Sequence, residues 1–197
     1  MGRPSLYVAF DIGIKNMAVC AVLLDGTIKA WRTLPLMEGM VRPSQDVLME
    51  TLFEHLDNLI AEVANHDLHI LIENQPSKMN PTMKTIQTWV QSYYALSRHW
   101  GADIANIHLV SPSQKLHGHA HKTGIEGKGY SFNKKEAVAL MRAYLKDAPK
   151  WRAYFEASKK KDDLADAACH AIAWIRRQGT ALEAVHDVPL NECSLSL

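Results

Sequence analysis

The chain has 197 residues, with 22 Lys and Arg against 21 Asp and Glu, so its formal net charge is +1. Apolar residues make up 47% and charged residues 22%, which is ordinary for a globular protein that buries a full core. The balance of charge excludes a molecule that is basic all over. Any surface that binds a polyanion must therefore be local.

The cysteine count and the apolar runs indicate where the chain works. Cys20, Cys169 and Cys193 are an odd set with no close pairing, which argues against a disulfide framework and for a reducing, intracellular compartment. The start lacks the long apolar run of a secretory signal, and no apolar run reaches the roughly 18 residues that a membrane span needs. We expect one domain over residues 1–180 and a C-terminal tail over 181–197.

The first third of the chain predicts three antiparallel strands. The apolar runs cover residues 6–13, 17–24 and 27–34, and Asp25-Gly26 is a hairpin signal between the last two. A helix follows from Pro43-Ser44 to about Asn65, because its apolar residues recur every three or four positions.

Helices and strands alternate after that. We expect a strand over 69–74, parallel to the first because a crossover helix precedes it. The remaining expected elements are a helix from a Thr82 cap to Trp100, a strand over 102–111, an irregular segment over 112–132, a helix that starts with an Asn133/Glu136 capping box, a short helix over 151–158, and a last helix from Asp162 to Arg177 stopped by Gly179. This order predicts an α/β fold with a mixed sheet and helices on both faces.

Four carboxylates fall at the ends of these elements. Asp11 ends the first strand and Glu73 ends the fourth, so parallel neighbours would place them at one sheet edge. Asp163 and Asp166 share a face of the last helix, being three residues apart. Asp162 lies four residues before Asp166, which leaves the choice between Asp162 and Asp163 open.

Helix capping explains only part of this pattern. Acids at a helix N-terminus are favoured by the helix dipole, which accounts for Asp162 and Asp163 but not for Asp166 or for the strand-end acids. Clustered carboxylates favour a divalent cation, and Mg²⁺ prefers oxygen ligands. Two such ions about 3.5–4 Å apart can hold the attacking and leaving oxygens of a phosphodiester.

The motifs VAFDIGIKNMA, LIENQ, FNKKEAV and DDLADA occur in this order along the chain. Together they resemble the RuvC-like Holliday junction resolvases, most closely the branch of poxviruses, other large DNA viruses and fungal mitochondria. The resemblance covers roughly residues 6–178 and implies a ribonuclease H-like fold. Asp11 and Gly13 of the first motif also occur in sugar kinases, but a sugar kinase-like protein would need a second lobe. The final Asp-x-x-Asp-Ala on a helix, with the internal Glu at a strand end, makes the combination specific.

The resemblance also implies the catalytic groups. The four metal-binding acids are Asp11, Glu73, Asp163 and Asp166, with two Mg²⁺ per active site and Mn²⁺ as a substitute. A lysine in a Lys-Glu-x-Val setting matches Lys135, which would balance charge on the scissile phosphate, and Lys134 is the competing assignment.

Basic residues surround the expected acidic site. Between Pro112 and Lys135 there are five lysines and one acid, Glu126, a local charge of five minus one, or +4, and 159–161 are three further lysines. We expect lysines to hold the DNA backbone and the loop after Glu73 to reach the junction centre. The expected DNA-binding residues are Lys15, Gln75, Lys78, Met79, Lys115, Lys122, Lys128 and Lys134.

One group of histidines and one isolated histidine invite a metal assignment. The HGHAH segment over 117–121 has no cysteine nearby, and a solvated loop is favoured over a zinc site. His170 shares a helix face with Asp163 and Asp166, so it is expected to border the metal site in a supporting position rather than as a ligand.

The sequence thus predicts a Mg²⁺-dependent endonuclease that resolves four-way DNA junctions by symmetric hydrolysis and leaves 5′-phosphate ends. Resolvases of this kind act as homodimers, because two opposed strands are cut. Two alternatives are a ribonuclease H-like nuclease on RNA–DNA hybrid or other branched DNA, and a junction-binding protein that does not cleave. The four acids count against the second. The expected compartment is the host cell or virion for a viral protein and the mitochondrial matrix for a fungal one.

Overall fold

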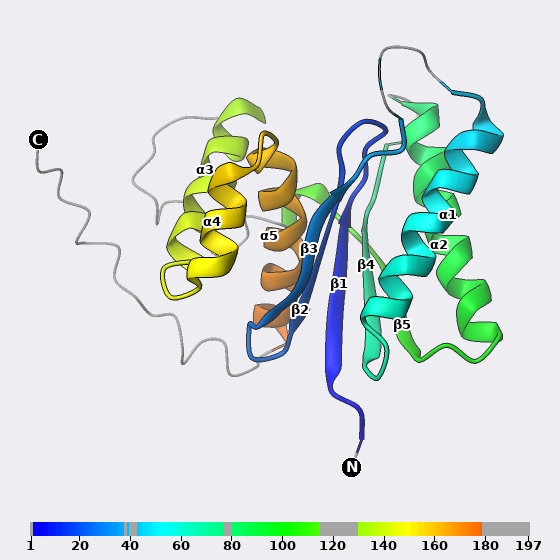
Figure 1. Ribbon diagram of the computed structural model, residues 1–197, viewed down its shortest axis with the longest axis horizontal. Coiled ribbons are helices and arrows are strands. Elements are labelled where there is room, and N and C mark those ends of the chain that lie inside the picture. The colour runs from blue at the N-terminus through cyan, green and yellow to red at the C-terminus, as the bar shows by residue number, and fades with distance from the viewer. Residues whose placement is uncertain (1, 38, 40–42, 77–79, 115–129, 179–197) are drawn as a thin grey trace, which may run out of the picture.

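The computed structural model describes residues 2–37, 39, 43–76, 80–114 and 130–178, which form a sheet between two layers of helices (Figure 1). The strands are β1 (Ser5–Asp11), β2 (Met17–Leu23), β3 (Ile28–Leu34), β4 (Asp67–Glu73) and β5 (Ile104–Val110). The helices are α1 (Gln45–Glu62), α2 (Pro81–His99), α3 (Tyr130–Tyr144), α4 (Pro149–Ala157) and α5 (Lys161–Arg177), with a 3₁₀ turn at Pro112–Gln114.

The sheet has the strand order β3-β2-β1-β4-β5. β1 pairs antiparallel with β2 and parallel with β4, and β4 pairs parallel with β5. The predicted mixed sheet is therefore confirmed, including the three-stranded meander and the parallel fourth strand. Gly26 adopts a φ of 89° in the β2–β3 turn, a conformation that glycine tolerates without strain.

Two apolar cores cover the two faces of the sheet. Leu6, Val8 and Phe10 of β1 point into the core below α1 and α2, while Tyr7 and Ala9 alternate to the face below α5. Figure 1 shows α1 and α2 on one side of the sheet and α3, α4 and α5 on the other.

Helix α5 lies closest to the sheet. Its residues from Leu164 to Ala173 are all buried, and it packs on β1 and β2. A helix buried on every side needs small residues where it meets its neighbours, and five alanines within this stretch meet that need. Trp31 of β3 donates a 2.9 Å hydrogen bond to the Leu164 carbonyl and so ties the start of the helix to the sheet.

One helix start agrees with the sequence-based expectation and two differ from it in detail. Helix α1 begins as predicted, with Ser44 accepting from the Val47 N–H. Helix α2 begins two residues earlier than predicted, because Asn80 accepts from the Met83 N–H and Pro81 occupies the first helical position. Helix α3 starts at Tyr130, so Asn133 lies inside it and the predicted capping box is wrong. The residues 149–157 form a separate helix, α4.

None of the helices in the described ranges combines the length and the apolar character that crossing a bilayer requires. The predicted C-terminal tail over 181–197 lies outside the described residues.

Candidate active site

The two strand-end acids occupy neighbouring positions of the sheet. β1 and β4 run parallel in a register that pairs Phe10 with Ile72, so Asp11 and Glu73 follow side by side at the same sheet edge. Glu73 is 7% exposed, and its Oε2 accepts a 3.2 Å hydrogen bond from the Gln75 side chain. This is the edge at which open α/β sheets place their sites, as the sequence predicts.

Helix α5 brings its own acids over that edge. Asp166 is 4% exposed, although it is a carboxylate within a buried and largely apolar stretch of the helix. One turn later, His170 is buried and its Nε2 lies 4.0 Å from Glu73 Oε1. This contact shows that the acidic face of α5 is turned toward the end of β4. The expectation that His170 borders the acidic site agrees with this placement.

The first turn of α5 is held by a lysine of α3. Lys134 Nζ lies 2.5 Å from Asp162 Oδ2 and 3.6 Å from Asp163 Oδ1. Burial would raise the pKa of Asp162, but the hydrogen bond and the charge of Lys134 outweigh burial and hold that pKa below its usual value. The two neighbouring aspartates therefore have different environments.

Asp163 is the more deeply placed of the two. Burial, reinforced by the Asp162 carboxylate and opposed by Lys134, raises the pKa of Asp163 above its usual value. Its Oδ2 is buried and accepts no hydrogen bond from the described part of the chain. A buried carboxylate oxygen without a donor is costly, and a cation would relieve that cost. The geometry thus favours Asp162 as the partner of Lys134 and Asp163 as the acid of the site.

A divalent cation fits the donors at this edge by their chemistry. No three His, Cys, Asp or Glu side chains in the described ranges stand close enough together to hold a metal ion. The match therefore rests on carboxylates that the backbone brings to one edge and on the orphaned oxygen of Asp163. Mg²⁺ keeps several waters and needs few protein oxygens, so this donor set suits it.

The remaining predicted residues are placed unevenly. Lys15 and Lys135 are exposed, and Lys135 has none of the contacts that Lys134 makes with the aspartates. Gln75 is buried beside Glu73. Other predicted positions lie outside the described residues: Lys78, Met79, Lys115, Lys122, Lys128 and the HGHAH histidines.

Sequence reasoning missed three polar residues near the site. Gln87 and Lys84 of α2 hydrogen-bond to each other and to the loop after Glu73, and Glu136 of α3 is 1% exposed with a buried Oε1 that has no donor within the described ranges. Gln87 had a signal in the sequence, because it interrupts the apolar face formed by Met83, Val90 and their neighbours. Glu136 was assigned to a helix cap instead.

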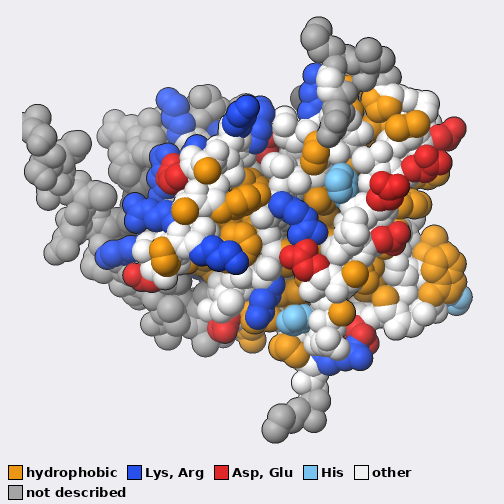
Figure 2. Space-filling view, in the orientation of Figure 1, with side chains coloured by type: hydrophobic (Ala, Val, Ile, Leu, Met, Phe, Trp, Pro, Cys, Tyr) orange, Lys and Arg blue, Asp and Glu red, His pale blue; other side chains and the backbone are white. Residues whose placement is uncertain are grey.

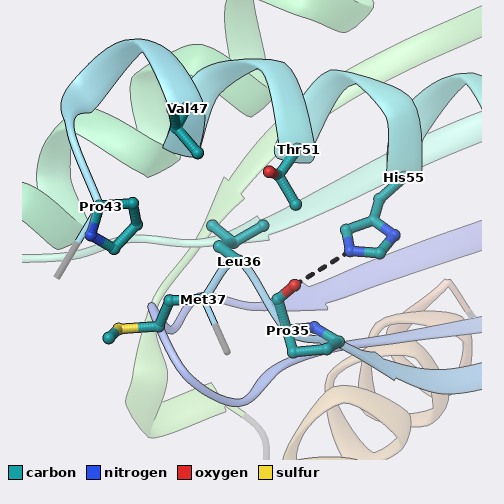
Figure 3. Close-up of a pocket in the computed structure, with 7 residues that line it drawn as sticks. All are labelled: Pro35, Leu36, Met37, Pro43, Val47, Thr51 and His55. Atoms are coloured by element: carbon teal, nitrogen blue, oxygen red, sulfur yellow. Dashed lines mark hydrogen bonds between the residues drawn. The ribbon is translucent and has the colours of Figure 1, made fainter. Parts of the chain in front are cut away.

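A separate hollow of about 420 Å³ lies between α1 and the segment that leads into it. Figure 3 shows its lining, with a hydrogen bond of 3.1 Å between His55 Nε2 and the Pro35 carbonyl. The lining is otherwise largely apolar and contains no carboxylate: Pro35, Leu36, Met37, Pro43, Val47, Thr51 and His55. It does not resemble the acidic edge and gives no support for chemistry there.

The fold of this chain is that of the RuvC-like, ribonuclease H-like proteins. The yeast mitochondrial Holliday junction resolvase has a TM-score of 0.59 and 18% identity, over 91% of this chain and 81% of that one. The fowlpox virus Holliday junction resolvase has a TM-score of 0.58 and 14% identity, over 88% and 99%. Thermus thermophilus RuvC in complex with a Holliday junction has a TM-score of 0.56 and 12% identity, over 89% and 98%.

The chain belongs to the family described as Poxvirus A22 protein, whose model matches residues 5–178. The resemblance read from the sequence motifs is therefore confirmed. A relative is the uncharacterized protein L451 of Acanthamoeba polyphaga mimivirus, which is 28% identical over 132 residues. That match covers 61% of this chain and 32% of the mimivirus protein, so the chain spans about a third of that relative's length.

Proposed function

We propose that this chain is a metal-dependent endonuclease that resolves four-way DNA junctions. The proposal is supported by the neighbouring strand-end positions of Asp11 and Glu73 and by the 4.0 Å distance between His170 Nε2 of α5 and Glu73 Oε1. Membership of the Poxvirus A22 family and the fold shared with three Holliday junction proteins point to the same activity.

The proposed ligand set is Asp11, Glu73, Asp163 and Asp166. When bound, two Mg²⁺ ions, or Mn²⁺ in their place, would supply a deprotonated water and charge neutralisation at the leaving oxygen. The chain's own contribution is to hold the acids. Gln75 fixes one oxygen of Glu73 by a hydrogen bond, and the burial of Asp166 limits its rotation.

Lys134 is proposed as the cation that assists the reaction. The Lys-Glu-x-Val motif favours Lys135, but Lys134 is the lysine that contacts the aspartates. Its ammonium already balances negative charge at the start of α5, so it is placed to balance charge on a phosphate that enters the same space. Lys135, exposed on the same helix, is assigned to the DNA backbone or to solvent.

Charge on the surface indicates which layer meets DNA. Helix α1 carries five acids and no lysine or arginine: Asp46, Glu50, Glu54, Asp57 and Glu62. Residues 142–161, from the end of α3 to the start of α5, carry seven Lys and Arg against two acids, a difference of +5. Figure 2 shows blue side chains gathered over α3 and α4 and red ones over α1. The attraction for a polyanion is therefore stronger over residues 142–161 than over α1.

The proposal extends to assembly and compartment. Two opposed strands of a junction must be cut symmetrically, for which a homodimer is the simplest arrangement. Cys20 and Cys169 are both buried and form no disulfide among the described residues, which suits a reducing compartment such as a host cell or a virion. The DNA-binding assignments of Lys15, Lys78, Met79, Lys115, Lys122 and Lys128 remain predictions.

The deciding experiment is a cleavage assay with three labelled substrates: a four-way junction, a linear duplex and an RNA–DNA hybrid duplex, each with and without Mg²⁺. We expect Mg²⁺-dependent cleavage of the junction alone, with 5′-phosphate ends. Asp166→Asn should abolish cleavage but retain junction binding, because it removes a ligand charge and little volume. Asp147→Asn, at an exposed acid, is the matched control and should cleave normally. Preferred cleavage of the hybrid, or junction binding without any cleavage, would replace the proposal by one of its alternatives.

A further inference from the structure

A lysine of α2, the helix that lies on the other side of the sheet from α3, is held in place without a charged partner. Lys84 of α2 donates hydrogen bonds to Asn74 Oδ1 at 3.1 Å and to Gln87 Oε1 at 3.0 Å. Both acceptors are neutral amide oxygens. Among the described residues, no carboxylate lies within ion-pair distance of the Lys84 ammonium.

The residues that hold Lys84 also hold Glu73. Gln87 is 1% exposed, and its Oε1 also accepts a 2.8 Å hydrogen bond from the backbone N–H of Gln75. The Gln75 side chain in turn donates to Glu73 Oε2. Lys84 is thus tied through Gln87 and Gln75 to a proposed metal-binding carboxylate, and its second acceptor, Asn74, directly follows that carboxylate in the chain.

Stability alone gives a poor account of this arrangement. Lys84 lies at the end of the first turn of α2, where the helix dipole disfavours a cation. Immobilising a long side chain also costs conformational entropy. A hydrogen bond from a lysine to a neutral amide oxygen offsets less of that cost than one to a carboxylate would. A cation that is held fixed, half-exposed and uncompensated at the edge of an acidic site is suited to an incoming anion.

We propose that Lys84 is a phosphate-binding residue, which contacts a backbone phosphate of the DNA strand lying on the β4 side of the site. The inference rests on the proposed function and adds to it a second lysine, on α2, opposite Lys134 on α3. The Gln87–Gln75 link would make the phosphate contact and the orientation of Glu73 mutually dependent. A lysine serves here as a fixed positive point charge rather than as a reader of sequence.

The test is a salt titration of four-way junction binding, with Ca²⁺ present to prevent turnover. Lys84→Met keeps the length and helix propensity of the side chain but removes its charge, and Lys84→Arg keeps the charge. Arg98→Met removes one exposed cation from the last turn of the same helix, about 21 Å away at 1.5 Å per residue, and serves as the matched control.

Losing one phosphate contact should reduce the slope of log affinity against log salt by about 0.9. When the salt is lowered from 200 to 50 mM, the ratio of the wild-type affinity to the Lys84→Met affinity should therefore increase by a factor of about 3.5. This factor is the fourfold dilution raised to the power 0.9. Lys84→Arg and Arg98→Met should keep the wild-type slope. A merely structural lysine would lower the melting temperature and leave the slope unchanged.

An unchanged slope for Lys84→Met, with a wild type that binds the junction, overturns this inference and leaves the proposed function standing. A wild type that does not bind the junction refutes the proposed function, and the inference with it. Should Lys84→Met melt well below the wild type, Lys84→Gln takes its place, because it retains a donor for Gln87. A wild-type slope in that variant equally overturns the assignment.

Discussion

The lysine next to the α5 aspartates offers the sharpest test of the site, because its neighbour along the chain is a natural control. Lys134→Ala removes an ammonium that lies 2.5 Å from Asp162 Oδ2 and 3.6 Å from Asp163 Oδ1. Two adjacent carboxylates then face each other without their cation. If this ammonium also balances charge on the scissile phosphate, the rate of cleavage should fall by a factor of about 10²–10³.

The cost in stability follows from how deeply the pair is buried. The side chains of Lys134 and Asp162 are 25% and 29% exposed. Exposed ion pairs contribute about 0.2–1 kcal/mol, whereas removing one partner of a fully buried pair costs about 3–5 kcal/mol. This pair lies between the two limits, and we expect a loss of about 1–2 kcal/mol in the free energy of unfolding. For a chain of this size, that corresponds to a melting temperature lower by about 2–8 °C.

The assay is single-turnover cleavage of a labelled four-way junction at saturating protein, with thermal melting of the same samples. Lys135→Ala, at the exposed neighbour, should keep the rate and change the free energy of unfolding by less than about 0.5 kcal/mol. The reasoning is refuted if Lys135→Ala slows cleavage and Lys134→Ala does not. Loss of stability without loss of rate would leave Lys134 a purely structural partner of Asp162.

Three further predictions follow from buried contacts and from the acidic edge. Trp31→Phe keeps an aromatic ring but removes the hydrogen bond to the Leu164 carbonyl, so calorimetry should show a free energy of unfolding lower by about 1 kcal/mol or slightly more. An unchanged free energy of unfolding would mean that this bond does not stabilise the start of α5. Burial, followed by the charge of His108, lowers the pKa of His69 below its usual value, so the unfolded chain binds that proton more readily. The folded state is favoured fully above a pH of about 6.5, and this advantage is lost as the pH falls. Between pH 7.5 and 5.5, the melting temperature of His69→Gln should therefore fall by less than that of the wild type. Equal falls in the two proteins would contradict this. Mg²⁺ should raise the melting temperature of the wild type more than that of Asp11→Asn, since a ligand that binds only the folded state stabilises it, and an equal rise in both would argue against Asp11 as a ligand.

The sequence by itself determined the sheet and the neighbouring positions of the two strand-end acids. Apolar runs with a turn at Asp25-Gly26 predict the three-stranded meander, and a crossover helix before the fourth strand predicts its parallel pairing, as observed. These signals are local, because strand alternation, turn residues and helix periodicity depend on neighbours within a few positions. The neighbouring positions of Asp11 and Glu73 also follow from local signals, because each acid ends a strand and the two strands run in the same direction.

Contacts between distant elements were decided only by the tertiary structure. Lys134 and Lys135 are adjacent in sequence and both belong to a plausible motif, yet only Lys134 reaches Asp162, because the packing of α3 on α5 turns one of two successive side chains toward that helix. Glu136 was likewise expected to cap a helix, but α3 starts earlier, at Tyr130, and Glu136 is a buried acid inside it. The link from Lys84 through Gln87 and Gln75 to Glu73 is another such contact, because it depends on how α2 packs against the end of β4. Sequence spacing fixes which residues share a helix face, whereas the rotation of one helix against another fixes which of those faces meet.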